Sequence, residues 1–158
     1  VSSRFNPARM HPVLHRVKSH KGVDYAAPEG APVWAAADGT ITFRGKQGGA
    51  GNLVVIRHAG GLTTLYMHLS KFAGGQKVGQ PIEAKTVIGY VGSTGLATGP
   101  HLHYEVLVNG RYMDPMRIKL PKGRTLDGEM RTAFETERYR VDTLLDRVRK
   151  PSRIAAIN

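Results

Sequence analysis

The sequence contains no cysteine, and this absence excludes both a disulfide framework and a thiolate metal site. Any metal must therefore be bound by histidine, aspartate or glutamate. With 158 residues, the chain is long enough for one domain that buries about 70% of the surface of its unfolded form. The lack of thiols is also compatible with an oxidising compartment.

A membrane-spanning segment and a signal peptide are also missing from the sequence. No apolar run approaches the roughly 20 residues that a transmembrane helix needs. The first residues, Val1 to Arg4, do not match a signal peptide, and the chain begins with valine instead of methionine. We therefore expect a processed product or a piece of a longer precursor with upstream domains.

Acidic residues are scarce, since 12 aspartates and glutamates stand against 23 lysines and arginines, for a formal net charge of +11. Such a surface attracts polyanions such as nucleic acid, anionic lipid or an anionic cell-wall polymer, although it equally serves solubility alone. No recognition helix, zinc finger or RNA-binding signature accompanies the charge. We therefore do not expect nucleic acid as a partner.

Glycine and proline are frequent, with 19 and 9 residues. Short β-branched runs alternate with turn signals roughly every 8–12 residues, a pattern typical of an all-β domain. Strands are expected at 32–36, 40–44, 52–58, 62–69, 86–91 and from residue 101 onward, and residues 19–30 should form a turn or a strand. The glycine-rich stretches 45–51 and 92–100 should be loops, 59–61 a hairpin connection, and 109–110 a hairpin turn.

The end of the chain has a different pattern. From Asp127 to Arg149, apolar residues recur at spacings of three, four and seven, which predicts an amphipathic helix that ends before Pro151. These apolar residues are Met130, Phe134, Val141, Leu144, Leu145 and Val148. We expect the helix to dock on a core; a partner-binding or membrane-surface helix is the alternative, and the mixed charge of its polar face argues against the membrane. The predicted division is a β domain at 1–116 and a linker with a helical extension at 117–158.

Seven histidines are present, and two of them form the pair His101-x-His103 at the start of a predicted strand. Side chains two apart on a strand share a face, so both imidazoles should point the same way. Pairs like this also occur in ordinary strands. Together with His20 and Asp24, however, His103 supplies two imidazoles and one carboxylate, the ligand set of many catalytic zinc sites.

Other polar residues carry weaker signals. By the same alternation, Tyr66 should share a face with His68, as part of the core or of a groove wall. Asn52 follows a glycine at a strand start, and we expect it to make a structural hydrogen bond. The remaining histidines, at positions 11, 15 and 58, more often prove to be surface or strand-packing residues.

Taken together, these motifs resemble the LytM/lysostaphin-type zinc metalloendopeptidases, which cut peptide cross-links in bacterial cell walls. The resemblance runs from about Arg4 to Pro115. It is carried by His20-Lys21-Gly22-Val23-Asp24, Tyr66-Met67-His68-Leu69-Ser70 and Thr98-Gly99-Pro100-His101-Leu102-His103-Tyr104-Glu105.

The resemblance implies a compact antiparallel half-barrel core and a zinc ion bound by His20, Asp24 and His103. His101 would be the general base or would orient the attacking water, and His68 would stabilise the oxyanion. The glycine loops would form the walls of a narrow cleft for a peptide. The helical extension resembles extensions on envelope-spanning Gram-negative members of the family, which favours a D-alanyl–meso-diaminopimelate cross-link over pentaglycine. The family resemblance itself implies a periplasmic or other cell-envelope location.

Two other functions remain open at this point. A non-catalytic protein of the same fold would bind peptidoglycan or activate another wall hydrolase, and such proteins typically lack some of the metal-site residues. A basic polymer-binding module would carry its histidines incidentally. Zinc content separates the enzyme from the polymer-binding module.

Overall fold

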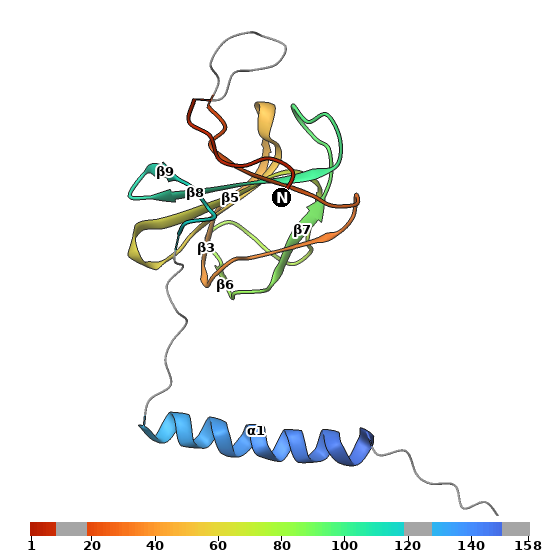
Figure 1. Cartoon of the computed structure of the whole chain (residues 1–158), viewed down its shortest axis with the longest axis vertical. Helices are drawn as coiled ribbons and strands as arrows, with labels where there is room; N and C mark the ends of the chain where they lie inside the picture. Colours follow the sequence, from red (N-terminus) through yellow and green to blue (C-terminus); the bar gives the residue numbers. More distant parts are fainter. Residues whose placement is uncertain (9–18, 119–127, 150–158) are drawn as a thin grey trace, which may run out of the picture. The chain divides into compact units, whose positions relative to one another are not determined.

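The computed structural model describes residues 1–8, 19–118 and 128–149 (Figure 1). The chain divides into two compact units, Val1–Pro121 and Lys122–Asn158, and each is described by itself. Four features discussed above lie outside the described residues: His11, His15, the start of the predicted helix at Asp127, and its stop before Pro151.

The first unit is built around one nine-stranded antiparallel sheet, as the sequence predicts. Its main path runs β1-β8-β5-β4-β3-β6, with β2 paired to β7, β7 to β5, and β9 to β8 (Figure 1). The strands are β1 Gly22–Ala26, β2 Pro32–Trp34, β3 Gly39–Gln47, β4 Gly51–Arg57, β5 Leu62–Phe72, β6 Pro81–Ile82, β7 Val87–Val91, β8 His101–Val108 and β9 Arg111–Met113. Short 3₁₀ turns at Gly48–Ala50 and Ala59–Gly61 connect β3 to β4 and β4 to β5.

The hydrophobic core lies on one face of the central strands. On β8, Leu102 and Tyr104 pack against the core, and the Tyr104 ring lies 5.3 Å from the ring of Tyr66 on β5. Because side chains alternate along a strand, His101 and His103 point to the opposite face of β8. The core residues are Val33, Ala35, Ile41, Val54, Ile56, Tyr66, Leu69, Ile82, Ile88 and Val91.

The predicted loop at 45–51 is wrong for its first half. Strand β3 continues to Gln47, with Gly45 paired to Leu53 and Gln47 paired to Gly51. The adjacent strand β4 supplies hydrogen-bond partners for this stretch, and these outweigh the poor strand propensity of glycine. Only Gly48–Ala50 remain as the connection. The predicted loop at 92–100, in contrast, lies between β7 and β8.

The second unit contains helix α1, Gly128–Arg149, in agreement with the apolar spacing. Two ion pairs lie along its exposed surface, Arg131 with Glu135 at 3.0 Å and Arg140 with Glu137 at 3.4 Å. Within the part of the chain that the structure describes, no helix has the length and apolar character needed to cross a membrane. Docking of the helix on a core stays a prediction.

Candidate metal centre

The pairing of β1 with β8 assembles the centre. Asp24 is the register partner of His103, and Ala26 is the partner of His101. Paired residues project to the same side of a ladder, so Asp24 lies beside both histidines of β8. His20 precedes β1 and forms a backbone bridge with Asn6 of the N-terminal segment.

Three predicted ligands converge on one point. The His103 Nδ1 atom lies 2.7 Å from Asp24 Oδ1 and 3.2 Å from His20 Nε2. His20 Nε2 lies 3.2 Å from Asp24 Oδ2. Ligand atoms bound tetrahedrally to zinc lie about 3.3 Å from one another, as follows from bonds of about 2.0–2.1 Å. One ligand atom from each of the two imidazoles and the carboxylate lies within 4.8 Å of the others, close enough for the three side chains to share one zinc ion.

In each ligand histidine, the ring nitrogen that does not face the other ligand atoms makes a hydrogen bond of its own. His20 Nδ1–H donates to the carbonyl of Arg4 at 2.7 Å, and His103 Nε2–H donates to Glu105 Oε1 at 3.1 Å. Sequence reasoning missed both partners. A backbone carbonyl leaves no sequence signal, whereas Glu105 has one, because it follows His103 by two residues on the same strand.

Neighbouring charges shift the pKa values of His103 and Asp24 in opposite directions. Burial lowers the pKa of His103, but its hydrogen bonds with Asp24 and Glu105 outweigh burial and raise that pKa to about 9. Burial raises the pKa of Asp24, but the hydrogen bond from His103 and the nearby histidine charges leave it below its ordinary value. A metal ion must displace the proton that His103 Nδ1 donates to Asp24.

Two further histidines border the three ligands. His101 Nε2 lies 3.8 Å from Asp24 Oδ1. The His68 ring lies 4.8 Å from the His101 ring and 6.0 Å from the His103 ring. The structure therefore brings all five predicted site residues into one cluster, and three of them supply the atoms of the metal-binding group.

The prediction that Tyr66 shares a face with His68 is wrong. Tyr66 lies in the core, while His68 faces the histidines of β8. The pairing of β5 with β4 shifts register between Tyr66 and Leu69, and His68 has a left-handed backbone with φ of 62°. This bulge interrupts the alternation by one residue, and it turns His68 toward the metal centre. A non-glycine residue in this conformation carries backbone strain, which is typical of functional sites.

A network of hydrogen bonds fixes the strained residue. His68 Nδ1–H donates to the carbonyl of Thr94 at 2.7 Å. The Thr94 hydroxyl donates to Leu69 O at 2.8 Å and accepts from the backbone N–H of Asn52 at 2.9 Å. The Asn52 side chain donates to Leu69 O at 2.9 Å and to Ser70 O at 3.2 Å, which confirms its predicted structural role.

The two non-ligand histidines have the same tautomer. A carbonyl oxygen only accepts, so His68 carries its proton on Nδ1 toward Thr94, and His101 carries its proton on Nδ1 toward Gly99 O at 2.8 Å. In the neutral ring, Nε2 is then a proton acceptor. Burial and the charges of the neighbouring histidines lower the pKa of His68, which favours its neutral form.

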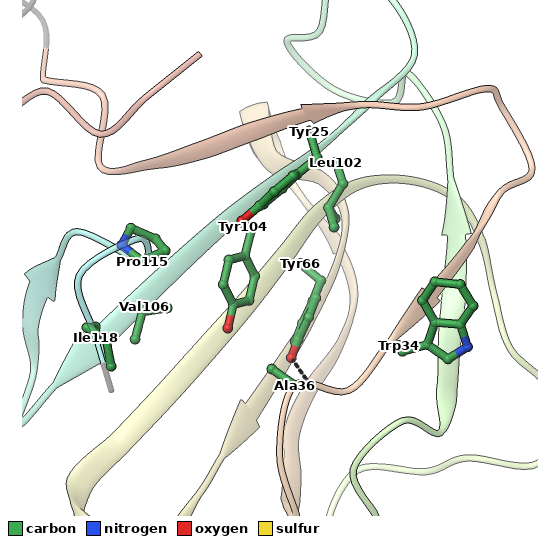
Figure 2. Close-up of a pocket in the computed structure, with 9 residues that line it drawn as sticks. All are labelled: Tyr25, Trp34, Ala36, Tyr66, Leu102, Tyr104, Val106, Pro115 and Ile118. Atoms are coloured by element: carbon green, nitrogen blue, oxygen red, sulfur yellow. Dashed lines mark hydrogen bonds between the residues drawn. The ribbon is translucent and has the colours of Figure 1, made fainter. Parts of the chain in front are cut away.

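An aromatic cavity of about 300 Å³ lies on the other face of β8. Figure 2 shows the neighbouring rings of Tyr66 and Tyr104, with Trp34 across the cavity. Its lining residues are Tyr25, Trp34, Ala36, Tyr66, Leu102, Tyr104, Val106, Pro115 and Ile118. None of the five clustered site residues lines it, so this cavity is separate from the metal centre.

His58 also lies apart from the centre. It is buried, with Nδ1 donating to Asp38 O at 2.8 Å and Nε2 2.7 Å from Thr64 Oγ1. These contacts agree with its expected role as a strand-packing residue.

Known proteins resemble the chain in sequence and in fold. The DD-carboxypeptidase/endopeptidase Mpg of Neisseria meningitidis is 49% identical over 149 residues, which are 94% of this chain and 34% of the relative. A zinc-containing peptidase from Vibrio cholerae superimposes with a TM-score of 0.71 at 46% identity, over 76% of this chain and 36% of that one. The catalytic domain of the antimicrobial peptidase lysostaphin from Staphylococcus simulans superimposes with a TM-score of 0.64 at 35% identity, over 73% of this chain and 87% of that one.

These similarities confirm the resemblance drawn from the motifs, but the match covers only part of the length of some relatives. The chain spans about a third of the length of the Neisseria and Vibrio relatives. The model of "Peptidase family M23" matches residues 18–115, which include all five clustered residues. The chain therefore belongs to peptidase family M23.

Proposed function

We propose that this chain is the catalytic part of a zinc-dependent endopeptidase that hydrolyses peptide cross-links of bacterial peptidoglycan. The observation that carries the proposal is the convergence of His20, Asp24 and His103, with two further imidazoles beside them. The name of the Neisseria relative, a DD-carboxypeptidase/endopeptidase, supports D-alanyl–meso-diaminopimelate as the cross-link. A periplasmic or other cell-envelope location follows from this substrate.

In this proposal, His20 Nε2, one carboxylate oxygen of Asp24 and His103 Nδ1 hold the ion. A bound zinc supplies a Lewis acid that activates water and polarises the scissile carbonyl. Asp24 and the outer hydrogen bonds keep the ligand atoms in place, so little reorganisation is needed when the substrate arrives.

His101 is proposed as the general base. Its Nδ1–H donates a hydrogen bond to Gly99 O, so Nε2 is the ring atom that takes the proton from the attacking water. After accepting this proton, Nε2 becomes the donor that returns it to the leaving amine. The hydrogen bond to Gly99 holds the ring orientation through both transfers.

His68 is proposed to stabilise the negative charge that develops on the substrate oxygen. Its Nδ1–H is committed to Thr94 O, so Nε2 donates a hydrogen bond only when the ring holds a second proton. Burial opposes that proton and the developing oxyanion favours it. The donor role therefore requires a proton that the His68 ring takes up from solvent, and the negative charge that develops in the transition state stabilises this protonated form.

A second candidate function is a non-catalytic M23 protein that binds peptidoglycan or activates another wall hydrolase. The presence of all five clustered residues favours the enzyme. Digestion of purified peptidoglycan with D-alanyl–meso-diaminopimelate or pentaglycine cross-links tests both, with fragments identified by mass. Release of uncross-linked peptides from the first substrate supports the proposal. Wild-type protein that binds zinc but leaves every cross-link intact would favour the non-catalytic function.

A further inference from the structure

An acidic residue, Glu105, lies behind His103 on β8. We propose that Glu105 is a positioning residue for the metal centre: it fixes the His103 ring with Nδ1 facing the metal and supplies a second negative charge beside the ion. This inference rests on the proposed zinc site and extends it to a residue outside the ligand set.

The contact between the two side chains is buried. Glu105 is 7% exposed and His103 is 8% exposed, and the His103 Nε2–H donates to Glu105 Oε1 at 3.1 Å. Glu105 follows His103 on β8 by two residues, so a rigid strand sets their separation. A carboxylate on the outer nitrogen of a metal-bound imidazole fixes the tautomer and raises the basicity of the ligating nitrogen.

Glu105 differs from the partners of the other site histidines. The outer nitrogens of His20, His68 and His101 each donate to a neutral backbone carbonyl. Among these four histidines, only His103 donates its outer N–H to a charged side chain. With Asp24, Glu105 supplies two negative charges, which match the charge of a divalent zinc ion in a partly desolvated site.

A glycine on the neighbouring strand leaves room for this contact. Gly22 is the register partner of Glu105. A Cβ atom at Gly22 would collide first with the backbone carbonyl of Tyr104, and it would also lie 2.9 Å from Glu105 Cγ and 2.9 Å from His103 Nε2, closer than such atoms pack. The glycine between the ligands His20 and Asp24 therefore allows the close approach of β1 to β8, and the same approach leaves room for the hydrogen bond between His103 and Glu105.

The test measures zinc affinity without any substrate, by competition with a chromophoric chelator. We expect Glu105→Leu to weaken zinc binding by about 10–100-fold, the usual cost of losing such an outer partner. Glu105→Gln keeps an oxygen that accepts the same hydrogen bond and loses only the charge. We expect it to recover only part of the affinity lost in Glu105→Leu: the recovered part measures the hydrogen bond, and the remaining loss measures the negative charge. Glu83→Leu, at an exposed carboxylate, is the matched control and should bind zinc like the wild type.

Two readouts separate positioning from simple stabilisation of the fold. Thermal unfolding of the metal-free variants reports stability alone. The ¹⁵N shifts of His103 in the zinc-loaded protein report which ring nitrogen carries the proton, and we expect Nε2–H in the wild type and in Glu105→Gln. Equal zinc affinity in wild type and Glu105→Leu overturns the inference while the zinc site stands. A wild-type protein that binds no zinc overturns the proposed function itself.

Discussion

Asp24 and His103 face one another across the ladder of β1 and β8, with Nδ1 of the histidine 2.7 Å from Oδ1 of the aspartate. The two residues are 79 positions apart in the chain, and only the completed ladder brings them together. His20, just before β1, completes the group. Because the unfolded chain has no such preformed site, zinc binding and formation of this ladder should stabilise one another.

Replacing His103 with alanine should remove zinc and activity together. The substitution deletes one of three ligand atoms and leaves Asp24 without its hydrogen-bond donor. We expect metal analysis of the purified protein to show one zinc per chain in the wild type and almost none in the variant. Full activity in a zinc-free variant would refute the site.

His58→Ala is the matched control for this experiment, because it removes another buried histidine. His58 contacts Asp38 and Thr64 and none of the metal-site residues. Its loss leaves buried polar atoms unpaired, so we expect unfolding to become easier by about 1–3 kcal/mol. Zinc content and the activity of the folded fraction should be unchanged.

Replacing His101 with alanine should separate metal binding from catalysis. His101 is outside the group of ligand atoms, so zinc should stay bound. Loss of a general base typically lowers turnover by about 10²–10⁴-fold. Measuring zinc content and cross-link cleavage on the same preparation checks both expectations. A variant with near-normal turnover would rule out the proposed role of His101.

Zinc affinity should depend steeply on pH. In the metal-free protein His103 has a pKa raised from 6.5 to about 9, so at neutral pH the ion must displace a proton. Below that pKa, apparent affinity should rise by about tenfold per pH unit, and it should level off above it. Chelator competition from pH 7 to 10 measures the slope. Calorimetry in buffers of different ionisation enthalpy counts the released protons, and an affinity that does not change with pH would contradict the expected coupling.

The raised pKa of His103 also predicts how the stability of the metal-free protein depends on pH: stability should fall as pH rises, whereas zinc affinity should increase. Because folding raises the pKa of His103, its contribution is fully present below pH 6.5 and is lost as pH rises through about 9. We therefore expect the free energy of unfolding of chelator-treated protein to fall across this range. The loss should be at most about 3 kcal/mol, by the conversion of pKa differences into free energy. Urea titrations at several pH values test the direction, and His103→Ala, which lacks the titrating group, should lose this dependence.

The part of the site that follows from simple strand alternation could be predicted from the sequence. His101 and His103 are two apart on a strand, and the structure places both beside Asp24. Alternation also predicts that Glu105 shares their face. The antiparallel sheet and the helix follow from turn residues and apolar spacing in the same way.

The remaining features depend on contacts that the local sequence does not specify. His68 leaves the regular alternation because β5 contains a bulge where it changes its pairing partner from β8 to β7. Residues 45–47 join β3 because β4 lies beside them, despite the glycine. The hydrogen bond from His20 to Arg4 uses a backbone carbonyl, which any residue at position 4 would provide.

Gly51→Ala should impair catalysis while zinc stays bound. Gly51 has φ of 65°, and a Cβ there would collide with Thr94. The Thr94 carbonyl accepts the hydrogen bond from His68, and the Thr94 hydroxyl donates to Leu69 O and accepts from the backbone N–H of Asn52. Since the metal ligands lie on β1, β8 and the segment before β1, the disturbance should reach His68 before it reaches them. We expect turnover to fall by about tenfold or more, because removal of one oxyanion donor costs about 10²–10³-fold.

Gly74→Ala is the control for this substitution, since Gly74 lacks a left-handed backbone and a Cβ there would meet no atom within 4 Å. It should keep both zinc and turnover. Zinc content, cross-link cleavage and the melting temperature, measured side by side, distinguish displacement of His68 from loss of the fold. If Gly51→Ala folds, binds zinc and cleaves like the wild type, then Thr94 does not hold His68 in its working position. If Gly51→Ala loses zinc as well, the bulge on β5 and the ligand cluster form one cooperative unit, and His68 cannot be perturbed separately from the metal.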